Sequence, residues 1–268
     1  MGRPGATHEG EYPRCRPPQH RAGRSPWAPV RRRGWAPITS LARMALPSQD
    51  VLETSRCVGA RPPSAAYRHR MMTSDTAEAV ARELLAESLP RRWAHTQGVA
   101  AKAAQLSPIT GPDADLLIAA AWLHDLGYAP ALAQAGTGFH PLAGARYLRD
   151  IEHADPDLCR LVAHHSCALA GATQLGLADT LAREFAPPSD DLADALTFCD
   201  MTTSPDGHST SVEHRLAEIC ARYGPADPVT RAITASAPNL TAAVDRVTKR
   251  LTTAGSAGAA THELNRMA

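Results

Sequence analysis

From residue 74 onward, apolar residues recur every three or four positions, the spacing that places them on one face of a helix. The stretch 114–126 is apolar nearly all round, so the sequence predicts a central buried helix there. Prolines and glycines interrupt the pattern and separate this helix from its neighbours. Further helices are predicted from about residue 74 to Pro90 and over 91–106, 142–150, 155–165, 168–182, 190–201, 212–223 and 242–251.

Strand patterns are nearly absent, because runs of β-branched residues and strict alternation of apolar and polar residues are rare. The sequence therefore predicts an all-α fold of about eight to ten helices in a single domain, without internal repeats. With 268 residues and 44% hydrophobic content, the chain can bury a sizeable core. We expect the domain to span residues 71–253, followed by a flexible tail of small residues over 254–268.

The first 70 residues have a different composition from the rest. They contain 13 arginines, no lysine and four acidic residues, a net charge of +9 that leaves −8 for the remainder. Ten of the 22 prolines also lie there, and no helical or strand period persists, so we expect this segment to be disordered. It can be a basic tail that binds nucleic acid or anionic lipid, or a transit peptide, although its prolines interrupt any amphipathic helix. Alternatively, translation starts at Met44, Met71 or Met72.

No apolar run approaches the roughly 20 residues that a membrane helix needs, and the N-terminus lacks the hydrophobic region of a signal peptide. The sequence therefore predicts a cytoplasmic protein without a membrane partner. Six cysteines occur without a Cys-x-x-Cys pair, and in a cytosolic chain they are expected to be reduced and buried. Cys159 and Cys167 flank a histidine pair, but oxygen and nitrogen ligands are already plentiful around them.

The pair His124-Asp125 lies at the end of the predicted central helix, and an imidazole beside a carboxylate can bind a divalent metal. Asp125 and Asp200 both end apolar helical stretches, where a buried carboxylate is costly unless a cation neutralises it. Lys102 and Lys249 are the only lysines in the chain, although arginines are available as partners. Separate helical segments supply the remaining candidate ligands, which are His95, His140, His164 and His165.

The order of these residues resembles that of the HD superfamily of metal-dependent phosphohydrolases. The similarity covers about residues 91–201 and comprises Arg92-x-x-His95-Thr-x-Gly-Val99, Ala121-x-Leu-His-Asp-Leu-Gly127, a histidine, a histidine-rich helix end and Asp200. His140-Pro-Leu-Ala-Gly144 and the pair His164-His165 further resemble the branch with extra histidines, which includes HD-GYP phosphodiesterases and bacterial hydrolases of diadenosine tetraphosphate.

Two features of the sequence depart from these relatives. Tyr128 stands where HD-GYP domains have a lysine, and no Gly-Tyr-Pro follows the histidine pair, so cyclic di-GMP is not expected as the substrate. The segment after Asp200 also differs from that of the tetraphosphate hydrolases. The resemblance therefore indicates the superfamily without specifying the substrate.

The resemblance implies one or two bound divalent ions. The ligands implied for the first ion are His95, His124, Asp125 and Asp200. Those implied for the second are His140, His164 and a bridging Asp125. His164 follows the apolar Leu161 by three residues, so we expect His164 rather than His165 to face the site. With this many nitrogen and oxygen ligands, Mn²⁺ or Fe²⁺ is favoured, and Mg²⁺ or Ni²⁺ can also fit.

The activity implied by the resemblance is hydrolysis of a phosphate ester or anhydride in a small, nucleotide-like substrate. Asp125 would help to hold a metal-activated water, and Arg92 would stabilise the negative charge of the phosphoryl group. Arg146 or His165 can share that role, and His165 can instead orient the substrate. Two other classes stay open, a di-iron oxygenase of the HD type and a non-catalytic regulator that binds nucleotide or metal. A nucleic acid partner is not expected for the folded domain.

Deleting residues 1–70 should leave the thermal stability of the remaining chain nearly unchanged, because a segment without a core contributes little to folding. Thermal unfolding followed by circular dichroism compares the full-length and shortened proteins. A fall in melting temperature of more than about 4 °C, which corresponds to roughly 1 kcal/mol in a domain of this size, would contradict the predicted disorder.

Overall fold

A computed structural model describes residues 71–133 and 137–267, and the surroundings of side chains up to residue 256. The predicted disorder of residues 1–70 therefore falls outside the described residues, as do Met44, Cys15 and Cys57.

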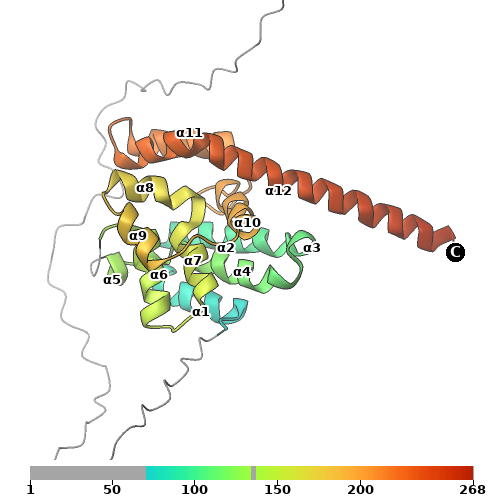
Figure 1. Ribbon diagram of the computed structural model, residues 1–268, viewed down its shortest axis with the longest axis horizontal. Helices are drawn as coiled ribbons and strands as arrows, with labels where there is room; N and C mark the ends of the chain where they lie inside the picture. The colour runs from blue at the N-terminus through green and yellow to red at the C-terminus, as the bar shows by residue number, and fades with distance from the viewer. Residues whose placement is uncertain (1–70, 134–136, 268) are drawn as a thin grey trace, which may run out of the picture. The chain divides into compact units, whose positions relative to one another are not determined.

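The described chain is helical throughout, and its helices are joined by short connections (Figure 1). The α-helices are α1 (Ser74–Leu85), α2 (Pro90–Ala104), α3 (Ser107–Thr110), α4 (Ala114–Leu123), α5 (Pro130–Ala133), α6 (His140–Asp150), α7 (Pro156–His164), α8 (Ala168–Gln174), α9 (Ala178–Glu184), α10 (Asp190–Met201), α11 (Val212–Tyr223) and α12 (Pro228–Met267). Three 3-10 helices are η1 (Gly111–Asp113), η2 (Leu126–Tyr128) and η3 (His165–Cys167). Within these residues, extended pairing is limited to one isolated bridge between Thr203 and Ser209.

The all-α prediction is confirmed for the described residues. Leaving aside α3 and α5, which have four residues each, ten longer α-helices remain, the upper end of the expected number. Helices α10 and α11 have the predicted bounds. The predicted helix over 168–182 is two helices, α8 and α9, separated by Gly176 with φ of 70°. A glycine adopts this left-handed conformation without steric cost, so the helix ends there.

Helix α12 is longer than the sequence predicts. A helix over 242–251 and a tail from residue 254 were expected, whereas α12 runs from Pro228 to Met267 through Pro238. Pro228 is acceptable at the first helical position, and an apolar stripe then packs against α8, α10 and α11. That packing stabilises the helix around Pro238, and alanine-rich sequence favours its continuation after residue 254. The stripe consists of Ala232, Leu240, Ala243 and Val247.

Helix α4 is the centre of the core, as its apolar sequence predicts. It contacts α1, α2, α7 and α10, and Leu117 and Leu123 are fully buried. Ala119, Ala120 and Ala121 are also fully buried, and their small side chains allow the neighbouring helices to approach closely. Because α4 is enclosed on several sides, the residues at its C-terminal end, His124 and Asp125, lie inside the protein.

A second, smaller apolar cluster joins the end of α10 to the two C-terminal helices. Its buried members are Met201, Val212, Ile219 and Leu240. Through these contacts α11 and α12 lie side by side, and α12 also contacts α8 and η3 (Figure 1). The C-terminal helices therefore cover the ends of the elements that carry His165 and Asp200.

The described cysteines partly meet the expectation. Cys159 and Cys199 are buried, whereas Cys167 and Cys220 are partly exposed, and these four form no disulfide. Among the described helices, none has both the length and the apolar character that crossing a bilayer requires.

Gly127, in η2, allows helix α6 to approach the backbone of η2 very closely. A Cβ atom at this position would lie 1.9 Å from the backbone carbonyl oxygen of His140 and 2.8 Å from the backbone nitrogen of Gly144. Both obstacles are backbone atoms, which cannot move as a side chain can. The glycine therefore allows α6 to pack against η2, and this packing brings His140 beside Asp125.

Replacing Gly127 with alanine should lower the free energy of unfolding by roughly 1–3 kcal/mol, because α6 must move to admit the methyl group. Urea unfolding followed by circular dichroism measures the change. The matched control is Gly255→Ala on the exposed face of α12, where an added Cβ meets no atom within 4 Å. That variant should be equally stable or up to about 1 kcal/mol more stable. Equal stability of Gly127→Ala and the wild type would show that the approach is not tight.

Candidate metal centre

Six histidine and aspartate side chains converge from five elements. They are His95 on α2, His124 and Asp125 after α4, His140 at the start of α6, His165 in η3 and Asp200 near the end of α10. All but His140 are buried, and His140 is partly exposed. Five of these six residues are ligands expected from the sequence. The sixth is His165, for which the sequence favoured its neighbour His164.

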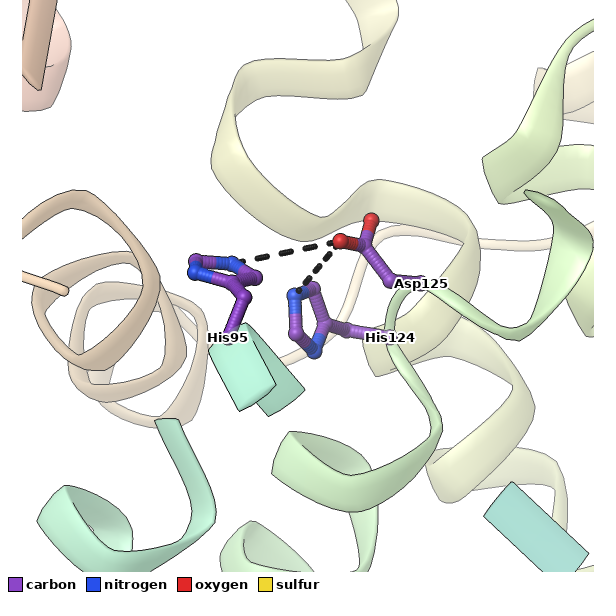
Figure 2. Close-up of side chains that lie close together, drawn as sticks. All are labelled: His95, His124 and Asp125. Carbon is purple, nitrogen blue, oxygen red and sulfur yellow. Dashed lines mark ion pairs between the residues drawn. The ribbon is translucent and has the colours of Figure 1, made fainter. Parts of the chain in front are cut away.

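A first group consists of His95, His124 and Asp125, whose ligand atoms lie close enough together to hold one metal ion. The Nε2 atoms of His95 and His124 lie 3.9 and 3.4 Å from the Oδ2 atom of Asp125. Figure 2 shows both imidazole rings directed at this oxygen. The three side chains come from α2 and from the end of α4, so their arrangement depends on the packing of these two helices.

A second group uses the other oxygen of Asp125. The Nε2 atoms of His140 and His165 lie 3.4 and 3.8 Å from Oδ1, and 3.2 Å from each other. These three residues also satisfy the geometric requirements of a metal site. The carboxylate of Asp125 thus presents one oxygen to each group, so it would serve both ions if each group held one.

Backbone carbonyls orient three of the histidine rings. The Nδ1–H groups of His95, His124 and His165 donate to the carbonyl oxygens of Ser204, Ala121 and Val162, at 3.0, 2.8 and 2.7 Å. A carbonyl can only accept, so Nδ1 carries the proton and Nε2 presents a lone pair to the centre in the neutral ring. Metal-binding histidines are commonly held in this way.

The Nε2 atom of His124 lacks a hydrogen-bond partner among the described residues, which indicates that it can bind a metal ion. It is buried and makes no hydrogen bond to any described residue, although Asp125 lies 3.4 Å away. Leaving a buried polar atom without a partner costs roughly 1–3 kcal/mol. A metal ion bound between His124, His95 and Asp125 would satisfy this atom, so the residues fit the ion.

Asp200 extends the first group. Its Oδ1 atom lies 3.1 Å from Nε2 of His95, and its Oδ2 atom accepts a hydrogen bond from the Ser166 hydroxyl. Because Nδ1 of His95 donates to a carbonyl, a neutral His95 would present a lone pair to this carboxylate oxygen. A proton or a metal ion between the two atoms removes that repulsion.

The pKa values of Asp125, His140 and His165 suit metal binding. Burial raises the pKa of Asp125, but Arg92 and His124 outweigh it and hold the pKa well below the usual value. Burial lowers the pKa of His140 and His165, so both rings are neutral near pH 7. A carboxylate and neutral imidazoles are the forms that bind divalent metals.

The structure places His164, the expected ligand of the histidine pair, outside both metal groups. The Nε2–H group of His164 donates to the Phe185 carbonyl at 2.8 Å, and His164 is in neither metal group. Helix α7 ends at this residue, and His165 has an extended conformation with ψ of 147°. The helical register from Leu161 therefore does not continue, and His165 is the residue that enters the centre. No glycine signals the turn, because Ser166 and Cys167 adopt its left-handed conformations with φ of 48° and 59°.

The two arginines proposed from the sequence lie in different places. Arg92 is mostly buried, forms an ion pair with Asp125 and lies over the Tyr128 ring, 4.0 Å from its centroid. Tyr128 in turn stacks on His140 at 3.9 Å. Arg146 instead binds Glu184, away from the metal groups. Of the two, the structure thus brings Arg92 to the centre.

A cavity of about 460 Å³ adjoins the metal groups. Arg92, Asp125, His140, His165 and Asp200 line one side of it, and most of the remaining lining is apolar. Sequence reasoning missed the residues that line the other side, because they follow the recognised motifs and carry no pattern of their own. Among them are Met201, Arg215, Ile219, Arg222, Tyr223 and Ile233.

Separate helices bring histidines and aspartates to one buried centre in an all-α fold. These features indicate the class of helical metal-binding domains. Residues 92–202 match the family model of the HD domain. The match begins at Arg92, includes all six residues of the centre and ends just after Asp200. The predicted resemblance is confirmed at the level of the family, which indicates a metal-dependent, hydrolase-type function. Neither the comparison with curated proteins nor that with solved structures found a match.

The purified protein should contain about one to two equivalents of divalent metal, because two groups share Asp125. His124→Ala should remove most of the metal. His165→Ala should lower the content by about one equivalent in protein that carries two, whereas His164→Ala, the matched control, should retain it. Inductively coupled plasma mass spectrometry on aerobic and anaerobic preparations measures the content. Less than about a tenth of an equivalent in both preparations, or equal loss of metal in His165→Ala and His164→Ala, would contradict the assignment.

Proposed function

We propose that this protein is a metal-dependent phosphohydrolase that cleaves a phosphate ester or anhydride in a small, nucleotide-like molecule. The observation that supports it best is the position of Asp125, whose two carboxylate oxygens face two separate histidine groups. A carboxylate that bridges two divalent ions is a recurrent feature of sites that hydrolyse phosphate bonds. The HD domain match supports the same class of reaction.

The proposed ligands follow from the two groups. For the first ion they are His95, His124, Asp125 and Asp200. For the second they are Asp125, His140 and His165. Nitrogen and oxygen ligands in these numbers favour Mn²⁺ or Fe²⁺ over Mg²⁺, which prefers oxygen and water. When bound, such ions lower the pKa of a coordinated water and neutralise the charge of the phosphoryl oxygens.

The protein residues then position and balance these groups. Ser166 donates to Asp200 and fixes the orientation of its carboxylate. Tyr128 packs between Arg92 and His140, so it holds both side chains at the edge of the cavity. Arg92 balances the charge of Asp125, and its place in the cavity lining allows it to stabilise a substrate phosphate. His165, first considered for orienting the substrate, takes the role of a ligand in this proposal.

The cavity supports a small substrate. Its volume of about 460 Å³ lies within the range of roughly 300–1,000 Å³ typical of small-molecule sites. We therefore infer a small phosphorylated compound rather than a nucleic acid as the substrate. Its largely apolar lining can exclude water around the reacting group and strengthen the electrostatic contacts there. A cytoplasmic location remains a prediction from the sequence.

With Mn²⁺ present, the wild-type protein should hydrolyse at least one member of a panel of nucleotides, dinucleoside polyphosphates and cyclic dinucleotides, measured by phosphate release and chromatography. Asp125→Ala should reduce kcat/KM by more than about a hundredfold, since it removes a ligand from both groups. His164→Ala should keep most of the activity, because its side chain binds the Phe185 carbonyl instead of the centre.

The same assay separates the rival functions. Turnover with Fe²⁺ that stops when oxygen is removed would identify an oxygenase and contradict hydrolysis. Nucleotide binding without turnover under any metal condition would identify a regulator. Hydrolysis that continues without oxygen and is lost in Asp125→Ala supports the proposal.

A further inference from the structure

Helix α11 and the first turns of α12 build a second part of the cavity lining. Its lining residues, among them Arg215, Arg222 and Ile233, come after residue 202, where the HD domain match ends. This wall is therefore a property of the present chain beyond the matched family segment. Its chemistry bears on which molecule can occupy the cavity.

Arg215 is an unusual residue for a buried helix face. The residue is only 6% exposed, yet it lines the cavity. Its Nη1–H group donates to Oε2 of Glu218 at 2.6 Å, while its Nε atom is buried and has no hydrogen-bond partner among the described residues. A buried guanidinium with an unused donor is costly, and native proteins seldom keep one without a ligand or a function.

Arg222 joins Arg215 through the same carboxylate. Its Nε–H group donates to Oε1 of Glu218 at 2.8 Å, and its side chain is 15% exposed. Burial raises the pKa of Glu218, but both arginines outweigh it and keep the pKa low, so Glu218 is ionised near neutral pH. Two guanidinium groups thus share one negative charge, and this cluster carries a net charge of +1. We call Arg215, Glu218 and Arg222 the α11 cluster.

Arg215 and Arg222 line the same cavity as Asp125 and Asp200 of the metal centre. Asp125 and Asp200 are engaged by histidines, Arg92 and Ser166, so they do not form the missing hydrogen bond of Arg215. Asp227 also lines the cavity, but its Oδ1 atom accepts from the backbone N–H of Val229 at the start of α12.

We propose that Arg215 and Arg222 bind a phosphoryl group of the substrate on the side of the cavity that faces Asp125. The ligand class rests on the proposed function, whereas the need for an anion comes from the α11 cluster itself. Guanidinium groups bind phosphate oxygens through paired, directional hydrogen bonds, and the apolar lining from Met201, Ile219 and Ile233 strengthens such bonds by excluding water.

In this proposal, metal binding and substrate binding belong to two different parts of the chain. Arg92, the arginine of the matched segment that lines the cavity, is committed to Asp125, whereas the two arginines of α11 share the single carboxylate of Glu218. The matched segment thus holds the metal ligands, and the helix after it binds the substrate anion. Arg215 is therefore a substrate-binding residue that the motifs do not contain.

The test is a calorimetric titration of inorganic phosphate into full-length, metal-loaded protein and into the same protein after chelation. Arg215→Gln should weaken phosphate binding by roughly tenfold to a hundredfold in metal-loaded protein, since a charge-assisted contact is lost. Arg215→Lys keeps the charge but loses the planar fork, so its phosphate affinity should lie between those of the wild type and Arg215→Gln. The matched control is Arg160→Gln on α7, whose ion pair with Asp157 has the same three-residue spacing and does not line the cavity.

Metal content and melting temperature are measured for every variant. If Arg215→Gln does not fold, Arg222→Gln replaces it, because Arg222 is more exposed, and it should also weaken phosphate binding. Phosphate affinity that is unchanged in a folded, metal-loaded Arg215→Gln protein would overturn the proposal.

Failure of this proposal can be told apart from failure of the proposed function. If no substrate is hydrolysed but Arg215→Gln still weakens phosphate binding, the anion site stands and the hydrolase assignment fails. If hydrolysis occurs and Arg215→Gln changes neither phosphate affinity nor KM, the hydrolase assignment stands and the anion site is wrong.

Discussion

The burial of one carboxylate, Asp125, is the constraint on which the rest of this structure depends. An isolated ionised carboxylate in a protein interior costs several kcal/mol, so it must be surrounded by positive or hydrogen-bonding partners. Arg92 pairs with it directly, and four imidazole rings surround its two oxygens. Groups from several helices thus balance the charge. Moving any of those helices would leave the buried carboxylate of Asp125 with fewer partners and destabilise the fold.

The packing of α4 and Gly127 makes that arrangement possible. An all-apolar helix can be enclosed on several sides, which carries its last residues into the interior. Gly127 then lets α6 approach so closely that His140 reaches the second oxygen of Asp125. The backbone carbonyls at Ala121, Val162 and Ser204 complete the arrangement, because they fix which ring nitrogen faces the centre.

The cavity combines two regions of different origin. The segment that matches the HD domain, residues 92–202, supplies the metal groups and part of the cavity lining. Helices α11 and α12 supply another part, with the positive α11 cluster next to apolar residues. The chemistry common to the family and the selection of a substrate can therefore reside in separate segments, joined by the apolar cluster around Met201 and Leu240.

Much of this protein could be predicted from its sequence by itself, because helical periodicity and the order of His95, His124-Asp125, His140 and Asp200 are local signals. They determined the all-α fold, the central helix and most of the centre. Only the tertiary structure decided between His164 and His165, since the choice depends on where α7 ends and on left-handed residues that no glycine announces. It also decided the length of α12, where packing overrides Pro238, and the approach of Arg215 to the cavity. These features depend on contacts between segments far apart in the chain, which no local pattern encodes.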